Sequence, residues 1–180
     1  MHHQFPVKGD SLWTVLRAMI VDSKRKVVIA GKRNLESGYL LDVYENDGQF
    51  VHSLGQGLLR YVIDLVLATD DRVIVLDKDC YIHMFSEHGD HLSEFKLSAC
   101  FTTRSIAFHH SSEHVVVAEE EVDYVYLHIY NKDGELVRGI KTHRIRPFQL
   151  RRMIVTAEGH VALLCERELF NGSVKVFILW

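Results

Sequence analysis

The stretch VVVAEEEVDYVYLHIYNKDGELVRGI, residues 115–140, decides the fold. It begins with the continuous apolar run VVVA, which is typical of a strand covered on both faces. Residues 124–130 follow with alternating character, and NKDG at 131–134 predicts a hairpin turn, because glycine accepts the positive φ that such turns need. Residues 135–140 then predict a more polar outer strand. With a first strand over 104–108, the stretch predicts four short antiparallel strands, ordered from innermost to outermost.

The apolar run recurs along the chain at a nearly fixed period. It appears in steps of 46, 42 and 46 residues, as VVIA at Val27, VIVL at Val73, VVVA at Val115 and VALL at Val161. Each run is followed by a strand-like segment that ends in an aromatic residue, namely Tyr44, Phe85, Tyr130 and Phe177. We expect these aromatics to pack between repeats, because they recur in phase. Four-stranded units at this period are typical of propeller blades.

We therefore predict an all-β fold, a β-propeller of four-stranded antiparallel blades that forms one domain over 1–180. Four repeats are expected, at approximately 14–57, 58–101, 102–146 and 147–180. Residues 4–9 resemble the outer strand of the first repeat, whereas the fourth repeat ends at 174–179 without an outer strand. Two interpretations stay open. Either residues 4–9 complete the last blade and close the ring, which removes exposed strand edges, or the chain is part of a larger propeller.

Composition narrows the classes of function. The net charge of −3 provides no global basic field, so nucleic-acid binding would need a local patch. Apolar runs are far shorter than a membrane span, and the first ten residues lack the apolar core of a secretory signal, so we expect a cytoplasmic protein without a membrane partner. Three scattered cysteines, Cys80, Cys100 and Cys165, suit a reducing compartment. Nucleophile motifs and glycine-rich phosphate loops are absent, so we expect no enzyme, no cofactor and no small-molecule substrate.

Several segments resemble NHL repeats. These are LDVYENDGQFVHSLGQG (41–57), IHMFSEHGDHLSEF (82–95), LHIYNKDGELVRGI (127–140), MIVDSKRKVVIA (19–30) and VIVLDKD (73–79). Asp77 and Asp79 stand where the family usually has an Asp and a following polar residue, whereas the matching sites elsewhere hold Gly31, Glu119 and Cys165. NHL propellers occur at the C-terminus of tripartite-motif ubiquitin ligases.

The resemblance implies a binding platform for RNA or a protein, with catalysis in a separate RING domain. This chain has no RING-type array of Cys and His residues, so it would be the recognition part alone. We expect a non-catalytic scaffold for a protein partner, in a role such as substrate recognition in a ubiquitin-ligase system. The alternative is single-stranded RNA binding, and a metal-dependent lyase or hydrolase is a third hypothesis.

A set of arginines gives the candidate binding face. Arg17, Arg104 and Arg151 each lie two positions before the first-strand residues Met19, Ile106 and Met153. Side chains at equivalent repeat positions gather on one face of a propeller, where arginine forks suit phosphate or carboxylate. Basic residues interleaved with aromatics also suit RNA. The complete candidate set is Arg17, Arg60, Tyr61, Arg104, Arg144, Arg146, Phe148 and Arg151.

Two other interpretations apply to the charged and titratable residues. The arginines could instead pair with Asp64, Glu158 or acids on neighbouring loops, as most surface charges are solvated or weakly paired. The twelve histidines raise the question of a metal site. His83 and His128 occupy equivalent positions that hold Asp42 and Lys175 in the other repeats, so we interpret this position as a half-exposed strand face and expect no metal site.

Overall fold

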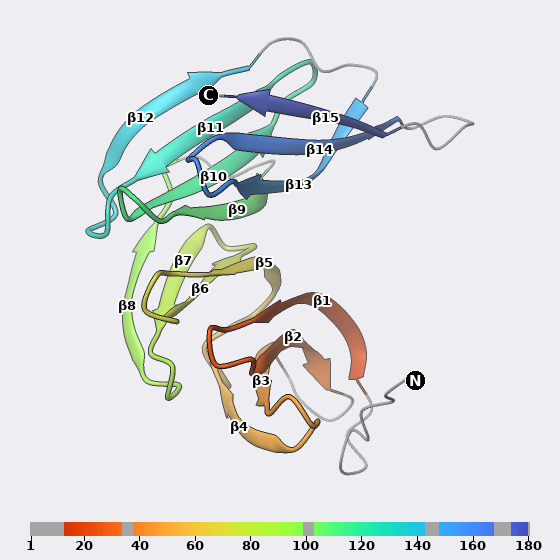
Figure 1. Cartoon of the computed structure of the whole chain (residues 1–180), viewed down its shortest axis with the longest axis vertical. Coiled ribbons are helices and arrows are strands. Elements are labelled where there is room, and N and C mark those ends of the chain that lie inside the picture. The colour runs from red at the N-terminus through yellow and green to blue at the C-terminus, as the bar shows by residue number, and fades with distance from the viewer. Residues whose placement is uncertain (1–12, 34–37, 99–102, 143–147, 168–173, 180) are drawn as a thin grey trace. The chain divides into compact units, whose positions relative to one another are not determined.

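A computed structural model describes residues 13–33, 38–98, 103–142, 148–167 and 174–179. Every regular element in these ranges is a β-strand (Figure 1). The described residues accordingly contain no helix that could cross a membrane. The chain forms two compact units, residues 1–94 and 95–180.

The first unit contains two antiparallel sheets whose strands are neighbours in chain order. The first sheet consists of β1 (Trp13–Val21), β2 (Val27–Arg33), β3 (Leu40–Tyr44) and β4 (Phe50–Leu54). The second sheet consists of β5 (Val62–Leu67), β6 (Val73–Asp77), β7 (Tyr81–Phe85) and β8 (His91–Lys96), which continues into the second unit.

The second unit contains two further sheets with the same strand order. The third sheet consists of β9 (Thr103–His109), β10 (His114–Glu120), β11 (Val125–Tyr130) and β12 (Leu136–Lys141). The fourth sheet has three strands among the described residues, β13 (Phe148–Val155), β14 (Val161–Arg167) and β15 (Val174–Leu179).

The predicted fold class is confirmed: the protein is an all-β propeller built from antiparallel sheets of blade topology. The expected lack of an outer strand beside residues 174–179 holds within the described part of the chain. Residues 4–9 lie outside the described residues, and so does the choice between closure and a larger propeller.

Glycine turns connect the third and fourth strands of the first three sheets. Gly48, Gly89 and Gly134 have φ values of 88°, 96° and 81°, as the sequence predicts. Each turn closes with the same backbone pattern; in the third sheet the Gly134 N–H donates to the Asn131 carbonyl at 3.1 Å. These shared turns start the outer strands at equivalent points of the repeat.

The continuous apolar runs form the centre of each unit. The core of the first unit includes Val28, Ala30, Val73 and Val75, and that of the second includes Val116, Ala118, Val161 and Leu163. The predicted burial of three recurring aromatics is confirmed, because Tyr44, Phe85 and Tyr130 are 7, 1 and 2 % exposed.

The alignment of the fourth repeat is wrong by two residues. Tyr44 pairs with Val27 and Tyr130 with Val115, but Val161, the matching residue of the fourth sheet, pairs with Leu179. Phe177 pairs with Leu163 instead and packs half-buried against the core. The aromatic therefore occupies the register position of His83 and His128, and Lys175 does not.

The cysteines differ in state. Cys165 is a fully buried free thiol, and burial raises its pKa to about 11, with a further contribution from the Glu120 charge. Cys80 is disulfide-bonded, a state that the scattered cysteines of the sequence do not predict.

Truncating the core of the first unit should be costly. Leu41 is fully buried, so we expect Leu41→Ala to lower the free energy of unfolding by about 2–5 kcal/mol, measured by urea titration. Leu92 in the same unit is 52 % exposed, and Leu92→Ala should change it by no more than about 0.5 kcal/mol. Equal losses in the two variants would contradict this assignment of the core.

Candidate functional site

Each innermost strand carries a β-bulge at the same position of the repeat. In β1 the pairing passes from Leu16–Gly31 to Ala18–Ala30, so Arg17 is the extra residue. The same shift leaves Ile63 extra in β5, Arg104 in β9 and Arg151 in β13. A bulge leaves one residue outside the ladder of pairs and bends the strand. The recurring arginines of the sequence are therefore bulge residues, and all three are exposed.

In the second unit the bulge arginines are neutralised by carboxylates of the adjacent strand. Arg104 Nε donates to Glu120 Oε2 at 3.1 Å, and Arg151 Nε donates to Glu166 Oε2 at 2.8 Å. Glu120 Oε1 also accepts the Leu150 N–H at 3.0 Å, which fixes this carboxylate between β10 and β13. The sequence left open that the arginines pair with acidic residues instead of binding a ligand. Arg104 and Arg151 do form such pairs, with Glu120 and Glu166.

In the first unit the bulge arginine stacks on a tyrosine. The Arg17 guanidinium lies 4.3 Å from the ring centre of Tyr61, and Lys78 Nζ lies 5.6 Å from the same ring. The buried Tyr39 ring lies 4.9 Å from the Tyr61 ring, with an interplanar angle of 47°. We call Arg17, Tyr39, Tyr61 and Lys78 the Arg17 cluster. Cations over tyrosine faces gain about 0.5–1 kcal/mol at exposed sites.

The Arg17 cluster carries positive charge that no acid among the described residues neutralises. Arg17 and Lys78 are both exposed, and among the residues that the structure describes neither has an ion pair with a carboxylate. Arg60, next to the cluster in sequence, is 3.8 Å from Asp79, with side chains 86 and 50 % exposed. An ion pair that exposed contributes little stability and leaves the guanidinium accessible.

Backbone hydrogen bonds hold the tyrosines of the cluster in place. The Lys78 N–H donates to the Tyr61 carbonyl at 3.0 Å, and the Tyr39 N–H donates to the Leu59 carbonyl at 2.9 Å. The first bond joins residues beside the ends of β6 and β5, and the second joins the residue before β3 to the segment before β5, so backbone hydrogen bonds support the cation-bearing surface. Such preorganisation lowers the entropy cost of binding.

The structure thus divides the candidate residues predicted from the sequence. It brings Arg17 and Tyr61 together, with Arg60 adjacent, and it places Arg104 and Arg151 in ion pairs of the second unit. Arg144 and Arg146 lie outside the described residues. Phe148 begins β13, and its side chain is not among those described.

Sequence reasoning missed Lys78 and Tyr39. Both belong to stretches that the repeat pattern assigns to strand ends, and the cluster they complete forms only when the first two sheets pack. The position of Lys78 in the repeat could have revealed it. Lys78 directly follows Asp77, and Asp77 pairs with Val62, the residue before the bulge in β5.

One interpretation of the third strands is wrong. The position of Asp42, His83 and His128 is not a half-exposed face in the first two sheets, because Asp42 is fully buried and His83 is 3 % exposed, whereas His128 of the third sheet is half-buried. Asp42 accepts hydrogen bonds from Ser53 Oγ at 2.6 Å and Tyr44 Oη at 3.0 Å, and also from the Arg33 guanidinium. Burial and then the Asp42 charge raise the pKa of Tyr44. Buried polar groups persist here because they satisfy one another.

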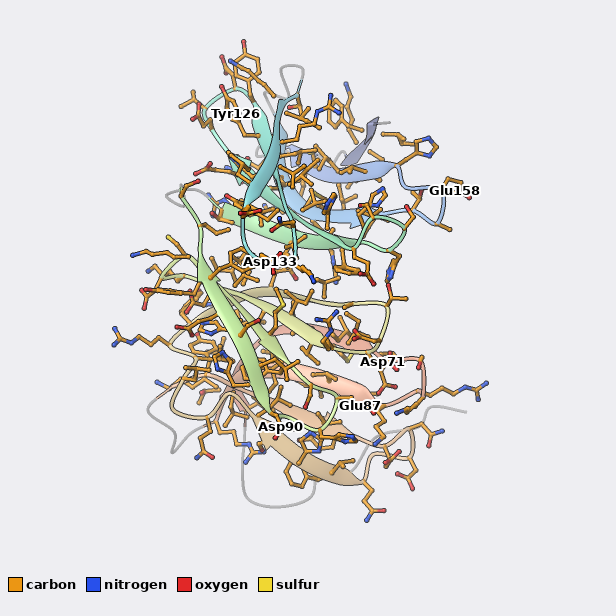
Figure 2. The ribbon with its side chains drawn as sticks, turned by 90° about the vertical axis from the view of Figure 1, so that its left-hand side faces the viewer. Asp71, Glu87, Asp90, Tyr126, Asp133 and Glu158 are labelled. Atoms are coloured by element: carbon orange, nitrogen blue, oxygen red, sulfur yellow. The ribbon has the colours of Figure 1, made fainter. Side chains whose placement is uncertain are left out.

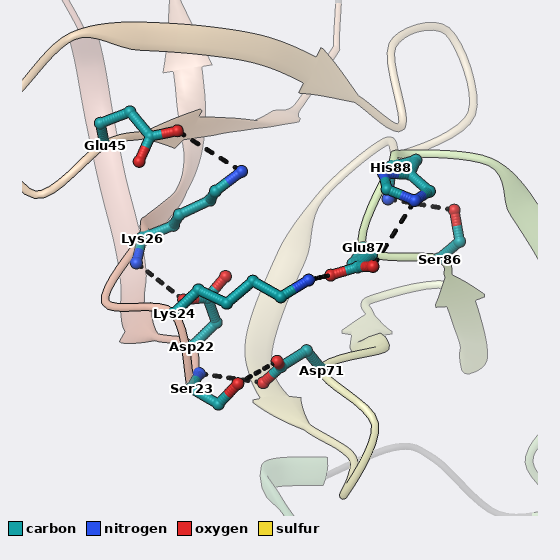
Figure 3. A network of polar contacts seen from close by, with 9 residues as sticks. All are labelled: Asp22, Ser23, Lys24, Lys26, Glu45, Asp71, Ser86, Glu87 and His88. Atoms are coloured by element: carbon teal, nitrogen blue, oxygen red, sulfur yellow. Dashed lines mark hydrogen bonds and ion pairs between the residues drawn. The ribbon is translucent and has the colours of Figure 1, made fainter.

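A second polar network joins the turns at another edge of the first unit (Figure 3). Lys24 forms an ion pair with Glu87, and Asp71 accepts hydrogen bonds from the backbone N–H of Ser23, at 3.0 Å, and from its hydroxyl. Asp71 and Glu87 lie near each other in the side view of Figure 2. The Lys24 contact lowers the pKa of Glu87, and the Ser23 hydroxyl followed by its N–H lowers that of Asp71.

The Asp71 contacts predict a pH-dependent contribution to stability. The folded pKa of Asp71 lies below its ordinary value of 3.8, so its contribution is present above that pH and is lost as pH falls through the folded pKa. Asp71→Asn should lower the free energy of unfolding at pH 7 by about 1 kcal/mol and should flatten its fall between about pH 5 and pH 3. Asn tolerates the φ of 60° at this position, so backbone strain does not confuse the result. Urea titrations at each pH measure both effects, and parallel curves for the two proteins would contradict the assignment.

Comparison with known proteins supports the fold and goes no further. The chain matches no family model and no curated protein. Among solved structures it is similar to virginiamycin B lyase from Staphylococcus aureus, with 14 % identity over 91 % of this chain and 55 % of that one, at a TM-score of 0.60. Hydrazine synthase from Kuenenia stuttgartiensis is 13 % identical over 89 % of this chain and 50 % of that one, at a TM-score of 0.67. The Pan2 WD40 domain from Neurospora crassa is 11 % identical over 90 % of this chain and 49 % of that one, at a TM-score of 0.61. The chain therefore spans about half the length of the structures it matches.

Proposed function

We propose that this protein is a non-catalytic scaffold that recognises an acidic segment of a protein partner through the Arg17 cluster. The observation that carries the proposal is the exposed Arg17 guanidinium, stacked 4.3 Å from Tyr61 and without a carboxylate partner among the described residues. Propeller folds are consistent with a binding role, because loops and strand ends display side chains on a rigid support.

The chemistry of the cluster favours carboxylates. A guanidinium stacked on a ring keeps its N–H edge free, and that edge matches a carboxylate with two parallel hydrogen bonds. Lys78 adds a second positive charge 5.6 Å from the same ring. Tyr and Arg are also the residue types that most often dominate the energy of protein interfaces.

The resemblance to NHL repeats supports a more specific role. It favours recognition of substrates in a ubiquitin-ligase system, with catalysis in another domain, and a cytoplasmic location belongs to the same proposal. One of the similar structures, virginiamycin B lyase, is an enzyme. That this chain is not catalytic is therefore part of the proposal.

Single-stranded RNA is the second candidate, because the cluster combines cations with an aromatic ring. Bases can stack on tyrosine while lysine and arginine contact the phosphates. The net charge of −3 places the protein-partner hypothesis first, since RNA binding commonly draws on a wider positive field.

Fluorescence anisotropy with defined probes tests the proposal. A labelled Glu/Gly peptide should bind, a Lys/Gly peptide of equal length should not, and Arg17→Ala should weaken binding about tenfold. Arg151→Ala is the matched control, because Arg151 is a bulge residue that is already paired with Glu166 at 2.8 Å. That variant should stay within about twofold of the wild type.

Other results would redirect or refute the proposal. If oligouridine binds more tightly than the acidic peptide, with steep salt dependence and the same loss in Arg17→Ala, the ligand is RNA. If Arg17→Ala and Arg151→Ala behave alike with both probes, the cluster is not the binding site.

A further inference from the structure

Two histidines and a glutamate converge at the outer strands of the second sheet. His83 Nδ1 of β7 lies 3.2 Å from Glu94 Oε2 of β8, and His91 Nε2 lies 3.7 Å from the same oxygen. One ligand atom from each of the three residues falls within 4.8 Å of the others. We call His83, His91 and Glu94 the β7–β8 triad, and all three belong to the first unit.

The spacing of His91 and Glu94 needs a physical reason, because residues three apart in a regular strand point to opposite faces. The outer strands β4 and β12 are bulged just after the glycine turn. In β12 Tyr130 pairs with Leu136 and Ile129 with Arg138, and β4 shows the same shift. His91 and Glu94 align with Leu136 and Gly139 when the two glycine turns are superposed in sequence. An extra residue at this point returns positions i and i+3 to one face.

His83 is oriented for metal binding by a buried carboxylate. Its Nε2 lies 3.2 Å from Asp77 Oδ2, while Asp77 Oδ1 accepts the Tyr81 N–H at 2.9 Å. Because the Asp77 carboxylate accepts, Nε2 carries the proton, and in the neutral ring Nδ1 then bears a lone pair. A carboxylate behind a histidine is the usual outer support of a metal-ligating imidazole.

The buried ligand atom of the triad is His83 Nδ1. His83 is 3 % exposed, and its buried Nδ1 makes no hydrogen bond within the described part of the chain, although Glu94 Oε2 is only 3.2 Å away. A lone pair that faces a carboxylate at this distance is unfavourable unless a proton or a metal cation lies between them, and His91, which converges on the same oxygen, favours the metal cation. Phe85, 1 % exposed, packs against His91 with ring centres 5.3 Å apart and gives the site an apolar wall.

We propose that the β7–β8 triad binds one Zn²⁺ ion, with Asp77 as the positioning residue for His83. Bonds of about 2.05 Å to ligands in a tetrahedral arrangement put ligand atoms about 3.3 Å apart, close to the 3.2 and 3.7 Å that separate Glu94 Oε2 from His83 Nδ1 and His91 Nε2. Two imidazoles and one carboxylate are ligands that zinc accepts. The exposed side of His91 and Glu94 leaves the fourth position to solvent.

Within the described part of the chain, the first and third sheets lack the ligand set of the second. In the first sheet the position equivalent to His83 holds Asp42, which contacts Arg33 and Ser53. In the third sheet His128 Nε2 lies 3.1 Å from Glu119, but the aligned outer-strand residues are Leu136 and Gly139, which offer no ligand. The repeats share the strand position of His83, but among the described residues only the second sheet has a complete set of ligands.

Isothermal titration of the purified chain with ZnCl₂, after treatment with a chelator, tests the proposal. We expect one tight site, at least about tenfold weaker binding in His91→Ala and in Glu94→Gln, and about 10–100-fold weaker binding in Asp77→Asn. His88→Ala and His128→Ala are the controls for adventitious binding by the twelve histidines, and both should stay within about twofold of the wild type. His88 is exposed in the turn between β7 and β8, and His128 occupies in the third sheet the position that His83 has in the second.

Cobalt provides a readout that a purely structural role would not change. Co²⁺ bound by the triad should give the visible absorption of a tetrahedral ion, and this absorption should be lost in His91→Ala and Glu94→Gln but kept in His88→Ala. The side chains of His91 and Glu94 are 35 and 43 % exposed, so these variants should keep the circular dichroism spectrum of the wild type. Equal zinc affinity in the wild type and the His91→Ala/Glu94→Gln double variant would overturn the proposal, as would the lack of a stoichiometric site.

Discussion

The arrangement of charged groups in this protein depends on one irregularity in strand pairing, the bulge in each innermost strand. Regular pairing continues on both sides of the bulge, but one residue is left outside the ladder. Since the irregularity recurs at the same point of each repeat, it presents Arg17, Ile63, Arg104 and Arg151 in equivalent ways. The bulge therefore determines where a charge is displayed, and its neighbours determine whether that charge is available.

The residue that decides this availability lies on the second strand of each sheet or directly after its end. The residue before each bulge pairs with a residue of the second strand, and the deciding residue comes next in the chain. In the first unit it is Lys32 or Lys78, and in the second unit it is Glu120 or Glu166. Glutamate there closes an ion pair with the bulge arginine, whereas Lys78 adds to the charge of the Arg17 cluster. A near-neutral chain can in this way hold a concentrated positive site, because charge is sorted by repeat rather than spread over the surface.

The sequence alone predicts the strands and turns well, because both follow local rules. The runs at Val27, Val73, Val115 and Val161 must be buried, and Gly48, Gly89 and Gly134 must accept positive φ. The register of the fourth repeat was not predictable in the same way, because Phe177 is apolar at either of two positions and only strand pairing distinguishes them. Candidate sites were predicted less well. Burial of Asp42 and His83 depends on partners from other strands, and periodicity carries no information on such partners.

The bulged outer strand also changes how ligand spacing should be interpreted. His-x-x-Glu, as in 91–94, is a spacing that is usually assigned to one face of a helix, because residues three apart are neighbours there. Here the same spacing lies within a strand and still gathers its two side chains. We infer that one extra residue, at the point where β4 and β12 are bulged, shifts the alternation. In blade-like repeats, a pair three apart just beyond a glycine turn can therefore belong to a β-sheet site, and a motif rule that considers only alternate residues would overlook it.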